Sequence, residues 1–344
     1  MLVKTSRPMG LLYTLDLPLR HPFATATGTL RSRQVAIVSL NADGLTGWGE
    51  AAPYPGQDES FDVMVAGFQS GTLTPTCRAA IDEALWDLRA RLEGTRLRDS
   101  LPSKRSTLPM SIAIGMDNDA LRRVAGFVDD GITRFKVKIA PGHTAHVREI
   151  REAFPDITLG LDANGAFSPR TLQELGALVD QNIAYLEQPV SDLTEPSVIG
   201  LKESGFIVLA DESVRSSADA ASVLGLPGVD GVVIKPGRLG WRGSLTAVEH
   251  ARSSGKLWRV SSLLETGIGR AYSESLASAD DVFLPDISSA DEFFTHDVVP
   301  SRASGPTIVI AKGHGVGIEV DVDALRSEAT QVLVINESAV PDLG

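Results

Sequence analysis

The chain has 344 residues, a formal net charge of −12, and 43% hydrophobic against 22% charged residues, which is ordinary for a globular protein large enough for two domains. The acidic balance excludes a general nucleic-acid binder, because phosphate neutralisation needs clustered Lys and Arg, but it allows a local basic pocket for an anionic substrate. The single cysteine, Cys77, excludes an intrachain disulfide, and the absence of a signal-peptide core or a long apolar run predicts a cytoplasmic protein that binds no membrane.

The first hundred residues predict a small α+β unit. The runs 10–17, 34–40 and 45–48 read as strands, and the NADG sequence between the last two is typical of a hairpin turn. Segment 76–97 has apolar residues at a spacing of three and four, which predicts a helix.

The domain organisation follows from where strands and turns like those of the first hundred residues appear again in the chain. We expect an α+β capping domain over residues 1–108 and a catalytic domain over residues 109–300. The tail between 306 and 335 again has strand-and-turn character, so part of 300–344 is expected to complete the capping domain.

Beyond residue 108, short β-rich runs alternate with helical stretches. The β-rich runs are 111–115, 134–139, 157–162, 184–189, 206–212, 231–236 and 257–262. The helical candidates between them include 144–154, 169–181, 215–224 and 241–254. Repeated βα units predict a parallel sheet, and seven or eight of them favour a TIM-type (β/α) barrel in the α/β class.

A chemically distinctive residue stands at the end of six consecutive runs, with gaps of 24, 25, 24, 24 and 26 residues. These residues are Lys138, Asp162, Glu187, Asp211, Lys235 and Ser261. A single strand-end Asp often caps the next helix, and a single strand Lys often reaches solvent. Five charged residues at one repeated pitch instead favour a shared pocket, because the C-terminal strand ends of a barrel meet at its mouth.

The chemistry of this set is specific. Asp162, Glu187 and Asp211 offer only oxygen ligands, which suit a hard divalent cation, Mg²⁺ first and Mn²⁺ as a substitute. Lys138 and Lys235 come from opposite sides of the carboxylate arc, so a small-molecule carboxylate on the metal would lie between them. This arrangement predicts proton abstraction next to a carboxylate, with the metal stabilising an enediolate and a lysine acting as base.

The motifs that surround these residues resemble the enolase superfamily and, within it, the muconate-lactonizing subgroup. They are KVK, LDANGAF, YLEQP, ADES, IKPGRLG and LLETGIGRA. The last two, together with LPDISSADEFF, are most similar to the o-succinylbenzoate synthase / N-succinylamino acid racemase branch. The resemblance covers nearly the whole chain and is far more specific for the fold than for the reaction.

The resemblance implies a role for each matching residue. Asp162, Glu187 and Asp211 match the metal ligands, and Lys138 matches the general base. Lys235 matches the lysine on the opposite face, which would stabilise the enediolate in a synthase or act as a second acid/base in a racemase.

Other matching residues would assist the substrate site. Lys136 would disfavour the ammonium form of the base by like charge, and Asn164 would lie beside substrate and metal. Glu212 is expected to lie behind these residues and to pair with a lysine across the barrel. Arg238 would tune Lys235, and Ser261 with Ser262 would help to hold a succinyl tail.

The reaction that this branch favours is a hydro-lyase step. A Mg²⁺-dependent o-succinylbenzoate synthase eliminates water from 2-succinyl-6-hydroxy-2,4-cyclohexadiene-1-carboxylate in menaquinone biosynthesis. The VSS sequence at 260–262 favours this synthase. N-Succinylamino acid racemase, cycloisomerase and dipeptide epimerase stay open, the last because Asp291-Glu292 could hold an ammonium. A Schiff-base aldolase and a non-catalytic barrel are alternatives from other classes, and a homo-oligomer stays open.

Three further features bear on specificity. FATATG at 23–28 is expected to form a loop over the barrel mouth, and Tyr54–Gln57 to line its other side. Trp241 stands where this branch commonly has a small residue, so it either narrows the pocket or packs on a helix.

Overall fold

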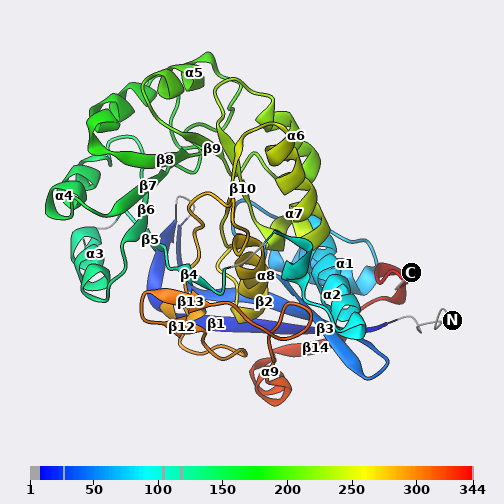
Figure 1. The fold of residues 1–344 in the computed structure, drawn as a ribbon. Helices are drawn as coiled ribbons and strands as arrows, with labels where there is room; N and C mark the ends of the chain where they lie inside the picture. The colour runs from blue at the N-terminus through cyan, green and yellow to red at the C-terminus, as the bar shows by residue number, and fades with distance from the viewer. Residues whose placement is uncertain (1–7, 26–27, 103–104, 117–118, 343–344) are drawn as a thin grey trace.

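The computed structural model describes residues 8–25, 28–102, 105–116 and 119–342. An antiparallel sheet with the strand order β14-β1-β2-β3 forms the base of the molecule (Figure 1). Its strands are β1 (Met9–Thr25), β2 (Gly28–Ala42), β3 (Leu45–Ala51) and β14 (Gln331–Val334). The predicted hairpin is confirmed, with Asp43 and Gly44 both at positive φ between paired Ala42 and Leu45.

Helices pack on one side of this sheet. They are α1 (Phe61–Ser70), α2 (Pro75–Glu93) and the 3₁₀ turn η1 (Leu97–Ser100). Two glycines of β3 let α2 come close, since a Cβ on Gly47 or Gly49 would lie 2.2 or 2.1 Å from a carbonyl oxygen of α2. The sequence prediction found α2 but missed α1, although Ser60 and Gly71 cap it.

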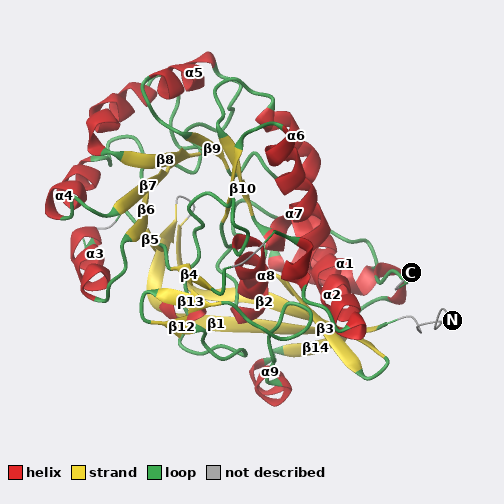
Figure 2. Cartoon of the chain, viewed as in Figure 1, coloured by secondary structure: helices red, strands yellow, loops and turns green. Residues whose placement is uncertain are grey.

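The seven predicted βα runs form one curved parallel sheet with the order β11-β10-β9-β8-β7-β6-β5, and the barrel helices lie on its outer side (Figure 2). The strands are β5 (Ile112–Ile114), β6 (Arg134–Lys138), β7 (Thr158–Asp162), β8 (Ile183–Glu187), β9 (Val208–Ala210), β10 (Gly231–Ile234) and β11 (Leu257–Val260). This confirms the TIM-type barrel with an α+β capping unit.

An irregular segment closes the barrel between β11 and β5. The amide of Asp286 donates to the Val260 carbonyl over 2.8 Å, and the amide of Ser111 donates to the Ile287 carbonyl over 2.8 Å. Residues 286–288 therefore occupy the place of an eighth strand.

Four of the outer helices match the four predicted ranges, with two differences. The outer helices are α3 (Ala120–Asp129), α4 (Ala145–Ala153), η2 (Leu172–Gln181), α5 (Pro196–Glu203), α6 (Ser217–Leu224), α7 (Pro236–Ser253) and α8 (Gly267–Ala277). Of these, α3, α5 and α8 had no predicted range. The stretch predicted at 169–181 is a 3₁₀ helix. The helix predicted at 241–254 begins at Pro236, because a kink at Gly240 (φ 71°) joins a short first turn to the longer helix.

The C-terminal part returns to the N-terminal unit. β12 (Ala303–Ser304) and β13 (Thr307–Val309) form a small sheet with β4 (Thr107–Pro109), and α9 (Val322–Glu328) leads into β14 beside β1. The turns η3 (Ala290–Glu292) and η4 (Glu337–Ala339) complete the described elements. Among the described residues, no helix has the length and apolar character needed to cross a bilayer.

Candidate active site

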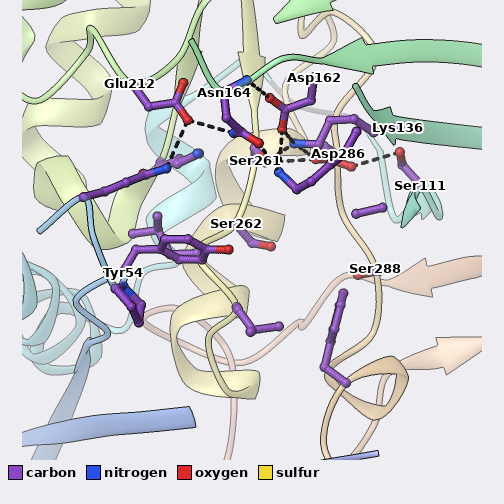
Figure 3. Close-up of a pocket in the computed structure, with 18 of the residues that line it drawn as sticks. Tyr54, Ser111, Lys136, Asp162, Asn164, Glu212, Ser261, Ser262, Asp286 and Ser288 are labelled. Carbon is purple, nitrogen blue, oxygen red and sulfur yellow. Dashed lines mark hydrogen bonds and ion pairs between the residues drawn. The ribbon is translucent and has the colours of Figure 1, made fainter. Parts of the chain in front are cut away.

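A cavity of about 240 Å³ lies at the C-terminal ends of the barrel strands. Barrel residues and the segment Tyr54–Gln57 line it. Figure 3 shows Asp162, Asn164 and Lys136 on one side of the cavity, and Tyr54, Ser262 and Ser288 on the other. Of the expected loop over the mouth, residues 26 and 27 lie outside the described residues, and Thr25 pairs with Gly28 in the β1–β2 hairpin.

Three carboxylates meet at the strand ends. Asp162 ends β7 and pairs in register with Glu187, which ends β8, and Asp211 follows β9. One oxygen from each lies within 4.8 Å of the others, and all three residues are buried. Glu187 Oε1 and Asp211 Oδ1 accept no hydrogen bond from the described residues, so the donor set fits a hard divalent cation.

The charges around this triad differ from member to member. Burial raises the pKa of Asp162, but Lys138, Lys136 and Lys235 outweigh it and hold that pKa well below its usual range. The pKa of Asp211 is also lowered, because Lys235 and Arg238 outweigh burial.

Glu187 behaves differently from the two aspartates. Burial raises its pKa to about 7, and the neighbouring Asp162 and Asp211 act in the same direction against Lys136 and Arg259. Glu187 is therefore the carboxyl of the triad whose charge depends most on a nearby cation.

Lys138 lies at the end of β6, next to the triad. Its Nζ is 3.2 Å from Asp162 Oδ2 and 2.5 Å from Asn164 Oδ1. Burial and Lys136 lower its pKa, as expected, but Asp162 outweighs both and the pKa is raised. The like-charge effect of Lys136 is present but does not decide the net direction.

Lys235 lies on the opposite flank of the triad. It directly follows β10, lines the cavity, and places Nζ 2.6 Å from Asp211 Oδ2. The two lysines thus contact different carboxylates of the same triad.

Arg238 does not line the cavity. In the first turn of α7 it reaches back, with Nη1 3.7 Å from Asp211 Oδ1 and Nη2 donating to Gln57 Oε1 over 2.9 Å. It therefore links a triad carboxylate to the capping unit instead of facing the cavity.

Lys136 lies one step deeper than Lys138 on the same face of β6. Its Nζ is 2.6 Å from Asp286 Oδ2, 3.1 Å from Glu187 Oε2 and 3.5 Å from Asp162 Oδ2. Three carboxylates surround this ammonium, so burial of the deeper lysine is compensated.

Glu212 does not form the lysine pair that the sequence predicts. Its Oε1 accepts hydrogen bonds from Asn164 Nδ2 at 2.8 Å and from Gln57 Nε2 at 3.1 Å, and the described residues give it no lysine ion pair. Lys138 and Lys235 are already held by Asp162 and Asp211, which leaves Glu212 to the two amides.

The two serines have different surroundings. Both line the cavity, but Ser261 donates to Asp286 Oδ2 over 3.0 Å, whereas Ser262 lies on the side of Tyr54 (Figure 3). Trp241 is fully buried and packs on Tyr272 with ring centroids 6.2 Å apart, so it packs on a helix and does not narrow the pocket.

Sequence reasoning missed Asp286. It follows Ser261 by 25 residues, which is the pitch of the other strand ends. It was missed because the closing segment lacks a β-rich run. Ser111 and Ser288 were missed as well, since isolated neutral residues carry no spacing signal, whereas the expected lining by Tyr54–Gln57 is confirmed.

Comparisons with known proteins agree with this geometry. Residues 119–324 match the family model described as enolase C-terminal domain-like, and residues 10–73 match the mandelate racemase / muconate lactonizing enzyme N-terminal domain. The chain is 29% identical to an o-succinylbenzoate synthase of Bacillus subtilis over 95% of this chain and 97% of the relative. It is 31% identical to an N-succinylamino acid racemase of Thermus thermophilus over 90% of this chain and 93% of the relative.

A solved structure has the same fold. An enolase-superfamily member from Listeria innocua superposes with a TM-score of 0.87 at 24% identity, over 97% of this chain and 100% of that one.

Proposed function

The chain belongs to the enolase superfamily, and from this premise we propose that it is a Mg²⁺-dependent o-succinylbenzoate synthase. The substrate would be 2-succinyl-6-hydroxy-2,4-cyclohexadiene-1-carboxylate, and the product 2-succinylbenzoate. The observation that carries the proposal is one cavity in which Lys138 and Lys235 contact opposite members of a buried carboxylate triad.

The triad residues Asp162, Glu187 and Asp211 would hold the cation. A bound Mg²⁺ would supply positive charge that stabilises the enediolate formed from the substrate carboxylate. Lys136 and Arg259, which contact Glu187, keep compensating charge beside the triad when the substrate brings its own negative charge.

Lys138 would do the proton chemistry. As base it takes the proton next to the carboxylate, which breaks the C–H bond. The same ammonium then returns a proton to the leaving hydroxyl on the same face, so the C–O bond breaks, a C=C bond forms and water leaves. One base suffices, because the ring becomes aromatic as the water departs.

Lys235 would act without transferring a proton in this reaction. From the opposite flank its ammonium would stabilise the enediolate electrostatically. Asn164 would hold Lys138 in place through the 2.5 Å contact with its Nζ.

The far side of the cavity is suited to an uncharged or anionic tail. Ser262, Ser288 and Tyr54 line it, and the lining carboxylate Asp286 is already paired with Lys136 at 2.6 Å. Asp291 and Glu292 are not among the lining residues. This supports a succinyl substrate over the free ammonium of a dipeptide, and so disfavours the epimerase.

N-Succinylamino acid racemase is the second candidate. It needs an acid/base on each face of the substrate, and the chain has lysines on both flanks of the triad. The racemase would use the same succinyl tail contacts, and the two reactions would differ in which lysine returns the proton: the same one in the synthase, the opposite one in the racemase.

The test is a direct comparison of the two reactions. Purified protein with Mg²⁺, and in parallel with Mn²⁺, is assayed on the synthase substrate and on N-succinyl amino acids. We expect a larger kcat/KM for the dehydration, and loss of both activities with a chelator. A larger kcat/KM for racemisation would overturn the first choice.

A further inference from the structure

A buried arginine lies below the triad, inside the barrel. Arg259 is the third residue of β11 and is 1% exposed. Its Nε is 2.9 Å from Glu187 Oε1, and its Nη2 is 3.7 Å from Asp286 Oδ1. It does not line the cavity, so it reaches the site only through these carboxylates.

An aromatic ring supports this guanidinium from the other side. Arg259 Cζ lies 3.9 Å from the ring centroid of Tyr185, which comes two residues before Glu187 on β8. Tyr185 is 2% exposed and packs with Leu209 and Val233 in the barrel interior. A guanidinium stacked on a ring in a packed interior is held in one orientation.

A glycine on the neighbouring strand makes room for the ring. Gly160 pairs with Tyr185 in the β7–β8 register, and a Cβ on Gly160 would lie 1.9 Å from Tyr185 Cζ. Gly160, Tyr185 and Arg259 therefore form a fitted stack beneath Glu187.

We propose that Arg259 is a positioning residue that orients Glu187 for the divalent cation. The inference rests on the metal site of the proposed function. Lys136 holds Glu187 Oε2 at 3.1 Å but also contacts Asp286 and Asp162, so it does not fix one carboxylate alone. Arg259 is the contact at the other oxygen.

The contact leaves Glu187 able to bind a cation. Although Nε and Oε1 are 2.9 Å apart, neither atom has an aligned hydrogen bond among the described residues. The pair is held by charge, so the Oε1 lone pairs are not taken up by a directed N–H. An outer residue of a metal site must orient a ligand without blocking the atom that binds the metal.

The test measures Mg²⁺ affinity by calorimetry on the full chain without substrate. R259M and R259K are compared with R134M and R134K. Arg134 is a half-buried arginine that lines the same small cavity as Arg259 and Tyr185, and within the described part of the chain it forms no ion pair with the triad. We expect R259M to weaken Mg²⁺ binding by about 10- to 100-fold. The Mg²⁺ affinity of R259K should lie between those of R259M and the wild type, since an ammonium lacks the planar fork of a guanidinium. Both Arg134 variants should bind Mg²⁺ as the wild type does.

A second readout separates positioning from general damage. At saturating Mg²⁺, kcat of R259K should recover to near the wild-type value. Wild-type Mg²⁺ affinity in folded R259M or R259K would overturn the proposal. So would unfolding of both variants, because Arg259 would then serve the fold and not the metal.

The outcome is distinguishable from failure of the proposed function. If the protein lacks synthase activity but R259M still loses Mg²⁺ affinity, only the reaction assignment fails. If wild-type protein binds no Mg²⁺, the metal site and the role of Arg259 fail together.

Discussion

Two buried groups of three carboxyls in this molecule have opposite surroundings. The triad at the barrel mouth faces side-chain cations: Lys138 and Lys136 at Asp162, and Lys235 at Asp211. The second group, which we call the junction cluster, consists of Glu50, Glu83 and Glu265, all fully buried where the capping unit meets α8.

Two members of the junction cluster, Glu50 and Glu83, are held by neutral donors. Glu50 accepts from the amides of Thr266 and Gly269 and from the Thr266 hydroxyl, and Glu83 Oε2 accepts from the amide of Glu50. The nearby Arg33 donates to the backbone carbonyls of Ala52 and Pro53 instead.

The difference appears in the pKa values. Burial raises the pKa of Glu50 to about 7 and that of Glu83 well above its usual value, whereas cations lower the pKa of Asp162 and Asp211. Three buried carboxyls therefore do not make a cation site by themselves. Neighbouring lysines and arginines favour the charged forms of Asp162 and Asp211, although Glu187 of the same triad keeps a raised pKa, whereas burial favours the neutral forms of Glu50 and Glu83.

The largest expected effect separates the two groups by activity. K138A removes the proposed base and should lower kcat for dehydration by about 10²- to 10⁴-fold, the usual contribution of a positioned base. Glu83→Gln at the junction should keep wild-type kcat. Steady-state assays at saturating Mg²⁺ measure both, and full turnover by K138A would remove Lys138 from the mechanism.

The next effect separates them by metal binding. Asp211→Asn and Glu83→Gln each remove one buried carboxyl. We expect D211N to weaken Mg²⁺ binding by at least about 100-fold, because a direct ligand matters more than an outer partner. E83Q should bind Mg²⁺ normally in calorimetry. A loss of affinity in E83Q would show that the junction cluster also serves the metal.

A third effect tests packing at the junction. A Cβ on Gly269 would lie 2.8 Å from Glu265 Cβ and 3.0 Å from Glu50 Oε2. G269A should therefore lower the free energy of unfolding by about 1–3 kcal/mol through overpacking. Gly126 in α3 has no atom within 4 Å of its Cβ position, so G126A should stabilise by about 0.5–1 kcal/mol. Denaturant unfolding measures both, and equal effects would contradict the tight junction.

The smallest expected effect is a pH dependence of stability. Glu83 has a raised pKa in the folded chain, so below its ordinary value of 4.5 both states hold the proton. As the pH rises further, the unfolded chain loses this proton and the folded chain keeps it, so stability falls.

E83Q should remove this loss. Relative to the wild type, we expect its Tm to be unchanged near pH 4.5 and about 2–4 °C higher at pH 8, which corresponds to about 1 kcal/mol for a domain of this size. Thermal scans at several pH values check it. A Tm difference that does not grow with pH would mean that Glu83 is ionised in the folded chain.

The sequence predicted the barrel and the convergence of its charged residues because a fixed pitch is a one-dimensional signal of βα units. The positions of Lys138, Asp162 and Lys235 followed from that pitch. Their catalytic roles stay predictions, as does the domain boundary at residue 108.

What the sequence did not predict depends on partners from distant strands. Arg259 in the middle of a short strand carries no signal of a buried stack, since Tyr185 and Gly160 lie 74 and 99 residues earlier. Glu212 was assigned a lysine partner because the pattern does not say which cation each carboxylate takes. The kink at Gly240 likewise has a distant neighbour, since a Cβ there would lie 2.7 Å from Asp82 Oδ2 of α2.

The irregular segment 286–288 makes barrel closure and site assembly one event. Its two backbone bonds join β11 to β5, and the same segment supplies Asp286, whose carboxylate holds Lys136 and Ser111. If these two hydrogen bonds break, Asp286 moves away from Lys136, and only the triad carboxylates remain beside that ammonium. A chain in which this segment has not closed therefore lacks the carboxylate that lies 2.6 Å from Lys136 in the closed barrel.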